Sequence, residues 1–439
     1  MSLRSSNGLT AAVSMTLCLA ACGGSTYTIG GTVTGLSSGR QVVLNDNASD
    51  ALTVTANGNF TFNTSVAANG SYVVTVGIQP TGQRCTVANG SGTGVTANVT
   101  NVSVSCATLS ESVYVVNQGD KTVSQYMVGT DGALAPMSTA TVATGNVPNC
   151  IAADPTGRYA YVVNQGDFTV SQFTIGSSGS LVPISPASAS AGFEPASLTI
   201  DPTGRYAYVT NPGAGVVLQY AVGSSGALTL ISPASVVAGV GAQSVAVDAT
   251  GHYAYVANAN DGTVSQYTIG TGGALTPMSS ATVAAGLTPY FIAVHPTGHY
   301  AYVANRGDNT ISQYTIGAGG TLTPMSPPTV AATPGNPQSV TVDPTGLYAY
   351  ATSPSQNVVL QYTIDSSGRL TPSSTMTIAT GATPSSLTID ATSRYAYVAN
   401  QGDNTVSQYA IGIGGVLTPL STATVAAGSH PFSITTAYH

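Results

Sequence analysis

A repeated segment dominates the C-terminal three quarters of the chain. The segment from Tyr159 to Arg205 recurs with variation from Tyr206, Tyr253, Tyr300, Tyr348 and Tyr395, and a partial copy begins at Val113. Successive copies begin about 47 residues apart, which lies within the range of periods found in β-propellers. Each copy is rich in Tyr, Val, Thr and Ile and is interrupted by Gly and Pro, which excludes the helical solenoids of similar period.

One copy of the repeat predicts four short strands. They cover residues 159–164, 169–175, a weak strand around 181–184, and 197–200. Polar turns separate them, and Asp201-Pro-Thr-Gly204 leads into the next copy with Asp, Pro and Gly at the positions that a type I turn favours. Four strands per repeat are typical of a propeller blade.

The ends of the repeat array predict how the ring closes. The chain holds seven copies of the Tyr-Val-x-Asn half but six turns of the Asp-Pro-Thr-Gly type. Pro431 to Thr435 aligns with Pro195 to Thr199, the innermost strand of another copy. We therefore expect the C-terminal strand to pair with the strands that begin near Val113, giving an all-β, seven-bladed propeller without free sheet edges.

The residues before the repeat predict a second, smaller domain. Alternating apolar and polar runs between Tyr27 and Ala107, spaced by Gly and Asn turns, are typical of an immunoglobulin-like β-sandwich. We expect this domain over residues 22–107 and the propeller over 108–439. Cys85 and Cys106 lie 21 positions apart and are expected to form a disulfide in an oxidising compartment. Cys150 has no evident partner and is expected to be a buried small apolar residue.

The first 21 residues resemble the signal peptide of bacterial lipoproteins. Arg4 supplies a positive charge, Leu9 to Leu19 form an apolar stretch too short to span a bilayer, and Leu19-Ala-Ala-Cys22 resembles a lipobox. The resemblance implies acylation of Cys22, hence attachment to the membrane through a lipid anchor. Gly23 after the Cys points to the outer membrane if the host is Gram-negative. An ordinary secretory signal is the alternative.

Composition excludes one class of partner. Charged residues make up 6% of the chain and the net charge is −7, so a polyanion such as DNA or RNA is not an expected partner. No cofactor motif or metal-ligand set stands out. His295 and His299 have a His-x-x-x-His spacing, but Pro296 and Gly298 place them in a turn rather than on a helix.

The segment Tyr206-Ala-Tyr-Val-Thr-Asn211 resembles the YVTN-type propellers and the related lactonase-type, 6-phosphogluconolactonase-like seven-bladed family. The resemblance covers residues from about 112 to 439 and implies hydrolysis of a sugar lactone. In that family a Gly-Pro-Arg-His signature enters the innermost strand on the functional face. No copy here has Arg-His; the matching positions read Pro148-Asn-Cys150, Pro195-Ala-Ser197, Ala242-Gln-Ser244, Pro289-Tyr-Phe291, Pro337-Gln-Ser339, Pro384-Ser-Ser386 and Pro431-Phe-Ser433.

Two polar sets recur with the repeat. One is the aspartate of the turn after each inner strand, which is expected to cap its own backbone: Asp154, Asp201, Asp248, Asp343 and Asp390. The other comprises loops such as Asn117-Gln-Gly-Asp120 and Asn164-Gln-Gly-Asp167, which either bond the turn backbone or form a rim that binds a cation or a sugar. Glu194 and His430 depart from the repeat in loops that enter inner strands, and are candidates for acid–base catalysis.

Two functional hypotheses remain. The first is a binding or interaction scaffold in the cell envelope, with a carbohydrate, small-molecule or protein ligand at one face of the propeller. The second is a lactone hydrolase, which rests on the family resemblance. A cluster of titratable groups on the seven inner-strand loops would favour the hydrolase, whereas a ring of Ser, Gln and Asn would favour the binding protein.

Overall fold

The computed structural model describes residues 25–80 and 82–439. The predicted signal peptide and Cys22 lie outside the described residues. The chain divides into two compact units, one ending at Thr108 and one beginning at Leu109. Among the described residues, no helix is both long and apolar enough to cross a membrane.

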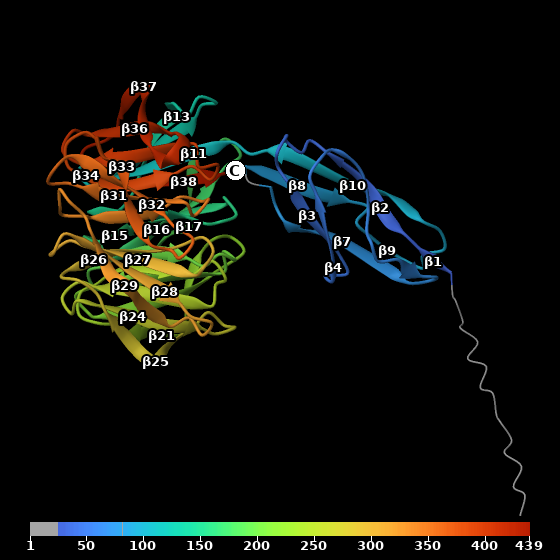
Figure 1. Ribbon diagram of the computed structural model, residues 1–439, viewed down its shortest axis with the longest axis horizontal. Helices are drawn as coiled ribbons and strands as arrows, with labels where there is room; N and C mark the ends of the chain where they lie inside the picture. Colours follow the sequence, from blue (N-terminus) through green and yellow to red (C-terminus); the bar gives the residue numbers. More distant parts are fainter. Residues whose placement is uncertain (1–24, 81) are drawn as a thin grey trace, which may run out of the picture. The chain divides into compact units, whose positions relative to one another are not determined.

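The first unit contains two four-stranded sheets and one short strand pair. One sheet has the order β5-β2-β10-β8, the other β4-β3-β7-β9, and β1 pairs with β6 (Figure 1). Their bounds are β1 Thr26–Tyr27, β2 Ile29–Thr34, β3 Val42–Asp46, β4 Asp50–Val54, β5 Gly58–Thr61, β6 Val66–Ala67, β7 Ser71–Ile78, β8 Gln83–Ala88, β9 Ser91–Thr93 and β10 Val99–Thr108. Alternate residues of β7 are buried, and Val33, Leu44 and Val104 lie in one fully buried core. The period of two places one face of each strand in this core.

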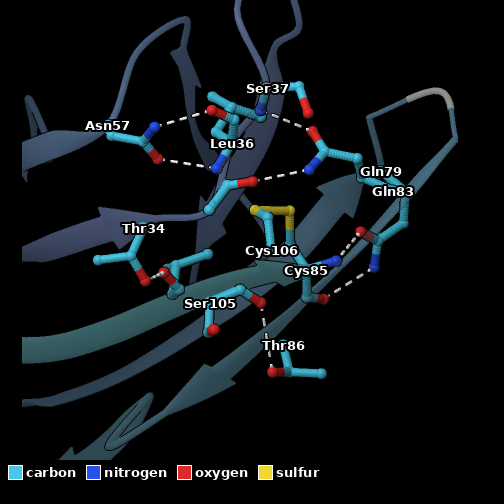
Figure 2. Close-up of a disulfide and its surroundings, with 12 residues drawn as sticks. Thr34, Leu36, Ser37, Asn57, Gln79, Gln83, Cys85, Thr86, Ser105 and Cys106 are labelled. Carbon is cyan, nitrogen blue, oxygen red and sulfur yellow. Dashed lines mark hydrogen bonds between the residues drawn. A yellow bond between two sulfur atoms is a disulfide. The ribbon is translucent and has the colours of Figure 1, made fainter. Parts of the chain in front are cut away.

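A disulfide joins Cys85 in β8 to Cys106 in β10, which lie directly opposite each other in the antiparallel pair (Figure 2). Amide side chains hold the backbone around it. The Gln79 amide donates to the Cys85 carbonyl and accepts from the Cys85 N–H, at 3.0 and 2.7 Å. Gln83 accepts from the Ser37 N–H and donates to the Gly35 carbonyl in the same way.

We expect removal of this disulfide to destabilise the first unit by about 3 kcal/mol, because the bond closes a loop with a sequence separation of 21. Non-reducing peptide mapping should find Cys85 and Cys106 in one linked species, and a Cys85→Ala/Cys106→Ala chain should show the loss in denaturant unfolding. Cys150→Ala is the matched control. Two free thiols in the mapping would contradict the prediction.

The second unit consists of seven four-stranded antiparallel sheets, which confirms the predicted propeller. Blade 1 contains, from the inside outwards, β38 (Pro431–Tyr438), β11 (Glu111–Asn117), β12 (Thr122–Val128) and β13 (Leu134–Ala143). Blade 2 contains β14 (Pro148–Ala153), β15 (Tyr159–Asn164), β16 (Thr169–Ile175) and β17 (Leu181–Ser190). Blade 3 contains β18 (Leu198–Ile200), β19 (Tyr206–Asn211), β20 (Val216–Val222) and β21 (Leu228–Val237).

The remaining four blades have the same order. Blade 4 contains β22 (Ala242–Val247), β23 (Tyr253–Asn258), β24 (Thr263–Ile269) and β25 (Leu275–Ala284), and blade 5 contains β26 (Pro289–Val294), β27 (Tyr300–Asn305), β28 (Thr310–Ile316) and β29 (Leu322–Ala331). Blade 6 contains β30 (Ser339–Val342), β31 (Tyr348–Ser353), β32 (Val358–Ile364) and β33 (Leu370–Ala379), and blade 7 contains β34 (Pro384–Ile389), β35 (Tyr395–Asn400), β36 (Thr405–Ile411) and β37 (Leu417–Ala426). A 3-10 turn, η1 (Ile413–Gly415), precedes β37.

The predicted closure of the ring is present. The red C-terminal strand β38 lies next to β11 in Figure 1 and pairs with it from Glu111↔Tyr438 to Asn117↔Pro431. Each inner strand contacts the inner strands of both neighbouring blades, and β34 contacts β38. The ring is therefore continuous through a blade that combines both ends of the repeat array.

The outer strands differ from the prediction. The weak strand expected at 181–184 is a ten-residue strand, Leu181–Ser190, with a bulge in its pairing between Ser171 and Phe173. Pro183 and Pro186 lie within it. Proline is tolerated there because every second N–H of an edge strand faces away from the sheet, and Pro186 lies in the bulge.

Hydrogen bonds between neighbouring blades explain why the repeat keeps its period. In each blade the buried tyrosine of the second strand donates to a glycine carbonyl of the next blade, as Tyr161 does to Gly226 at 2.7 Å. Tyr397 of blade 7 donates to Gly132 of blade 1 at 2.7 Å and so continues the pattern across the seam. The tyrosine and the glycine that it binds are 65 residues apart in Tyr161–Gly226 and 66 apart in Tyr302–Gly368, so the bond limits how far the period can vary.

Candidate binding site at the channel mouth

Antiparallel pairing brings two kinds of loop to the same end of the ring. Within a blade, the turn between the second and third strands lies at the same end as the loop that enters the inner strand, because successive strands reverse direction. The aspartate in the turn between the second and third strands binds the backbone of the inner-strand loop. Asp167 accepts from the Asn146 N–H at 2.6 Å, Asp261 from the Val240 N–H at 2.7 Å and Asp308 from the Leu287 N–H at 2.8 Å.

The seven inner-strand loops converge on one cavity of about 210 Å³, here called the channel mouth. Each loop contributes two consecutive residues, and the turns that contain Gln118 and Gln165 add one glutamine each. The lining is Gln118, Asn149, Cys150, Gln165, Ala196, Ser197, Gln243, Ser244, Tyr290, Phe291, Gln338, Ser339, Ser385, Ser386, Phe432 and Ser433. A second cavity of about 330 Å³ continues along the inner strands.

The chemistry of the channel mouth is that of neutral hydrogen-bonding groups and aromatic rings. Among the described residues that line it there is no Asp, Glu, His, Lys or Arg. The aromatic residues belong to two blades: Tyr290 and Phe291 to blade 5, and Phe432 to blade 1. The guanidinium of Arg306 lies 5.3 Å from the centroid of the Tyr290 ring and donates to the Asn336 amide at 3.2 Å.

Several serine hydroxyls of the channel mouth also join neighbouring blades. Ser433 accepts from the Ile151 N–H at 3.2 Å, and Ser244 accepts from the Ile292 N–H at 3.3 Å. Each of these hydroxyls keeps its proton for another acceptor. The mouth can therefore offer donors as well as acceptors to a bound molecule.

Cys150 is the free thiol of the described residues and lies half-buried in the channel mouth. Its Sγ is 3.4 Å from the Leu198 N–H nitrogen of the neighbouring blade. Burial raises the pKa of the Cys150 thiol, with hydrogen bonds from Leu198, Ser197 and Ser433 acting in the opposite direction. A thiol whose pKa is raised is protonated at neutral pH and is a weak nucleophile.

The structure does not bring the two catalytic candidates together. Glu194 and His430 are exposed, neither lines the channel mouth, and blade 2 lies between their blades. Both occupy the residue before the inner-strand proline, at φ of 52° and 55°. Val147, Thr288 and Thr383 have the same left-handed backbone at this position, so the conformation belongs to the loop and not to a particular side chain.

The recurring aspartates of the turns after the inner strands have structural contacts. Asp154 accepts from the N–H groups of Arg158 and Tyr159 at 2.6 and 2.8 Å, and Asp201, Asp248, Asp343 and Asp390 repeat this pattern. His295 replaces the aspartate in blade 5 and contacts Thr297 and the Gly346 carbonyl at 2.8 Å each.

The Asn-Gln-Gly-Asp loops use their Asn and Asp side chains to hold backbone, which is the first of the two expected roles: the Gly145 N–H donates to Asn164 and the Asn146 N–H donates to Asp167. Their Asn and Asp side chains bind the backbone and the strands, as Asn164 does through Thr169 and Ser171. The glutamine between them faces the channel mouth in blades 1 and 2, as Gln118 and Gln165. The sequence indicates this role only weakly, through a polar glutamine at a position where it caps no turn.

Comparison with known proteins identifies the family. The model of the family described as lactonase, 7-bladed β-propeller, matches residues 113–329 and 323–433, so the chain belongs to this family. A search of curated proteins found no match.

Solved structures agree with the fold. A candidate 6-phosphogluconolactonase of Bacteroides fragilis matches with a TM-score of 0.66 at 19% identity, over 74% of this chain and 98% of that chain. The periplasmic gluconolactonase of Pseudomonas aeruginosa matches with a TM-score of 0.63 at 17% identity, over 75% and 99%. A Lactobacillus plantarum protein matches with a TM-score of 0.63 at 18% identity, over 75% and 99%.

Proposed function

We propose that the channel mouth binds a small, uncharged, polyhydroxylated ligand of monosaccharide size. The observation that carries this proposal is the lining, in which seven loops present amides, hydroxyls and aromatic rings but no charged side chain among the described residues. A cavity of about 210 Å³ is small beside the roughly 300–1,000 Å³ of drug-sized sites, so it suits a single sugar ring.

The lining matches the two kinds of surface that a sugar ring presents. Glutamine and asparagine amides donate and accept at once, which suits a hydroxyl that also does both. Phe432 belongs to blade 1 and the pair Tyr290 and Phe291 to blade 5, on nearly opposite sides of the seven-bladed propeller. Their rings offer apolar faces for the C–H groups of a sugar. A charged ligand would lose its hydration at this mouth without gaining an ionic partner there.

Hydrolysis of a sugar lactone is the second candidate, and family membership favours it. Such a reaction needs a base or nucleophile near the carbonyl carbon. The titratable side chains of the lining are Cys150 and Tyr290, and burial raises the pKa of the Cys150 thiol. The lining therefore supports binding better than hydrolysis.

Calorimetry with glucose, galactose, glucono-1,5-lactone and gluconate separates these functions. We expect binding of an uncharged sugar or of the lactone, weak or no binding of gluconate, and no lactone hydrolysis above the buffer rate. Gln243→Ala should weaken binding about tenfold by removing hydrogen bonds to the ligand. Gln356→Ala, an exposed glutamine outside the lining, is the matched control. Lactone turnover that is lost in Cys150→Ala would favour the hydrolase, and binding of none of the four compounds would refute the proposal.

We also propose that the protein is exported and held in the cell envelope by a lipid on Cys22, in the outer membrane if the host is Gram-negative. The Leu19-Ala-Ala-Cys22 segment supports this, together with a disulfide typical of oxidising compartments. Intact-mass analysis of the membrane fraction should find an acylated N-terminal cysteine. A Cys22→Ala protein should leave the membrane fraction, and one that remained bound would contradict the anchor.

A further inference from the structure

Exposed apolar side chains gather on one side of the face that carries the channel mouth. Six large apolar residues at one end of blades 2 to 5 are 40–75% exposed. We call them the apolar crescent: Val147, Phe168, Phe193, Val237, Val240 and Leu287. Phe168 lies in a turn between second and third strands, Val237 is the last residue of the outer strand β21, and the other four lie between an outer strand and the next inner strand. All six are therefore at the channel-mouth end of the ring.

The crescent is confined to part of the ring. Phe193, Val240 and Leu287 occupy one equivalent position in the loops of blades 3, 4 and 5. The same position holds small or polar residues in the other blades: Asn146, Gly335, Ala382 and Ser429. If this position followed the repeat, it would be apolar in all seven loops or in none of them. Departure on consecutive blades makes a one-sided surface, and exposed apolar surface of this kind marks a contact site.

The loops hold the crescent in place. The Asn211 amide donates to the Phe193 carbonyl at 3.0 Å, and Asp261 and Asp308 accept from the Val240 and Leu287 N–H groups. Phe168 and Phe193 join two blades, with ring centroids 5.2 Å apart. The backbone is fixed while the side chains remain exposed, so a ligand would meet an ordered surface and lose little affinity to ordering it.

The crescent is continuous along the chain with the channel mouth. Val147 precedes Pro148 and the mouth residues Asn149 and Cys150, and Phe193 lies three residues before Ala196, which also lines the mouth. One ligand could therefore occupy both surfaces. Its polar end would need the neutral amides of the mouth, and its other end would need apolar surface.

We propose that the natural ligand is an amphiphile: an uncharged sugar-sized head in the channel mouth with an acyl or alkyl chain lying over the apolar crescent. This inference rests on the proposed function and names the class of its ligand. The mouth alone is too small for such a molecule, and the crescent supplies the apolar surface that the chain would otherwise expose to water.

The test compares methyl β-D-glucopyranoside with n-octyl β-D-glucopyranoside, the latter below its critical micelle concentration, by calorimetry on the full chain. The two probes share a head and differ in the chain. We expect the octyl glucoside to bind about tenfold more tightly or better, because several methylene groups leave water. A Phe193→Ser/Leu287→Ser variant should lose that preference and still bind the methyl glucoside as before. Both replaced side chains are exposed, and Phe193→Ser also removes the ring contact with Phe168, so the thermal transition should fall only slightly.

Leu347→Ser is the matched control, because Leu347 is 54% exposed but lies at the opposite end of the ring, in the turn before β31. It should leave the octyl preference intact. Equal affinity for the two glucosides, or a preference that survives the double substitution, would overturn the role of the crescent and leave the proposed function standing. The proposed function itself would be contradicted if neither glucoside bound, or if Gln243→Ala left the affinity for octyl glucoside unchanged. Octanol binding as tight as octyl glucoside binding would also overturn a joint site.

Discussion

Deletion of Pro431 to His439 is expected to abolish cooperative unfolding of the propeller. These residues carry β38, the inner strand of blade 1, which pairs with β11 along its whole length. Without it, backbone groups of β11 lose their partners beside the channel, and β14 and β34 lose the neighbour that joins them. The mouth also loses Phe432 and Ser433. Calorimetric melting and light scattering should show a missing transition or aggregation.

A rearranged chain provides the control for this deletion. The His439 N–H donates to the Ser110 carbonyl at 3.0 Å, so the two ends of the propeller meet. Moving residues 431–439 to a position between Thr108 and Leu109, behind a flexible Gly/Ser linker that reaches from Thr108 to the Pro431 end of the strand, keeps the strand but changes its place in the chain. This protein should melt cooperatively, whereas the deletion should not. An unchanged transition in the deletion protein would refute the closure and the count of seven blades.

Glu111 is expected to make the stability of the propeller fall as the pH rises. It lies in β11 opposite Tyr438 of β38, in the seam of blade 1. Burial and, to a smaller extent, the neighbouring Asp390 raise the pKa of the Glu111 carboxyl from 4.5 to about 8, against the opposite effects of Tyr438, the Ala391 amide and Arg394. One carboxyl oxygen, Oε1, has no hydrogen-bond partner among the described residues.

The sign of the effect follows from the direction of this shift. A carboxyl whose pKa is higher in the folded state binds its proton more tightly there. Its contribution to stability is complete below pH 4.5 and is lost as the pH rises towards about 8. Each pKa unit corresponds to about 1.4 kcal/mol, so the loss reaches a few kcal/mol at alkaline pH.

Glu111→Gln should remove this dependence, because glutamine has a similar shape and no charge. Denaturant unfolding between pH 4 and 9 should give a flatter profile for the variant, with a gain of a few kcal/mol over the native chain above pH 8. Glu194→Gln replaces an exposed carboxylate and serves as the control, with the native slope expected. A native-like slope in Glu111→Gln would assign the pH dependence to other groups.

The sequence was sufficient to predict the ring and its closure. The repeat recurs about every 47 residues, and its strands, turns and edge prolines are consequences of local residue preferences. One blade is built from both ends of the repeat array, near Val113 and Pro431, and aligning the repeats predicted it. The length of the outer strand did not follow, because Leu181–Ser190 extends through prolines that only an edge position tolerates.

The candidate site could be predicted in part. The inner-strand loops were identified as the functional positions, and their side chains line the channel mouth. Glu194 and His430 were predicted as catalytic candidates because they depart from the repeat. A departure from the repeat does not show where a side chain lies, and both are exposed and outside the mouth lining. Gln118 and Gln165 were read as turn residues because their loops have capping neighbours on either side.

Strand order and turn chemistry are properties that each copy of the repeat carries in its own residues, and the number of blades follows from the number of copies, so the sequence determined all three. The channel mouth and the apolar crescent are not carried by any one copy. They arise because seven loops, spaced about 47 residues apart along the chain, meet at one end of a closed ring, where single departures on neighbouring blades add up to one surface. Only the tertiary structure decided which loop residues face the cavity, because this depends on the direction of each side chain in the closed ring.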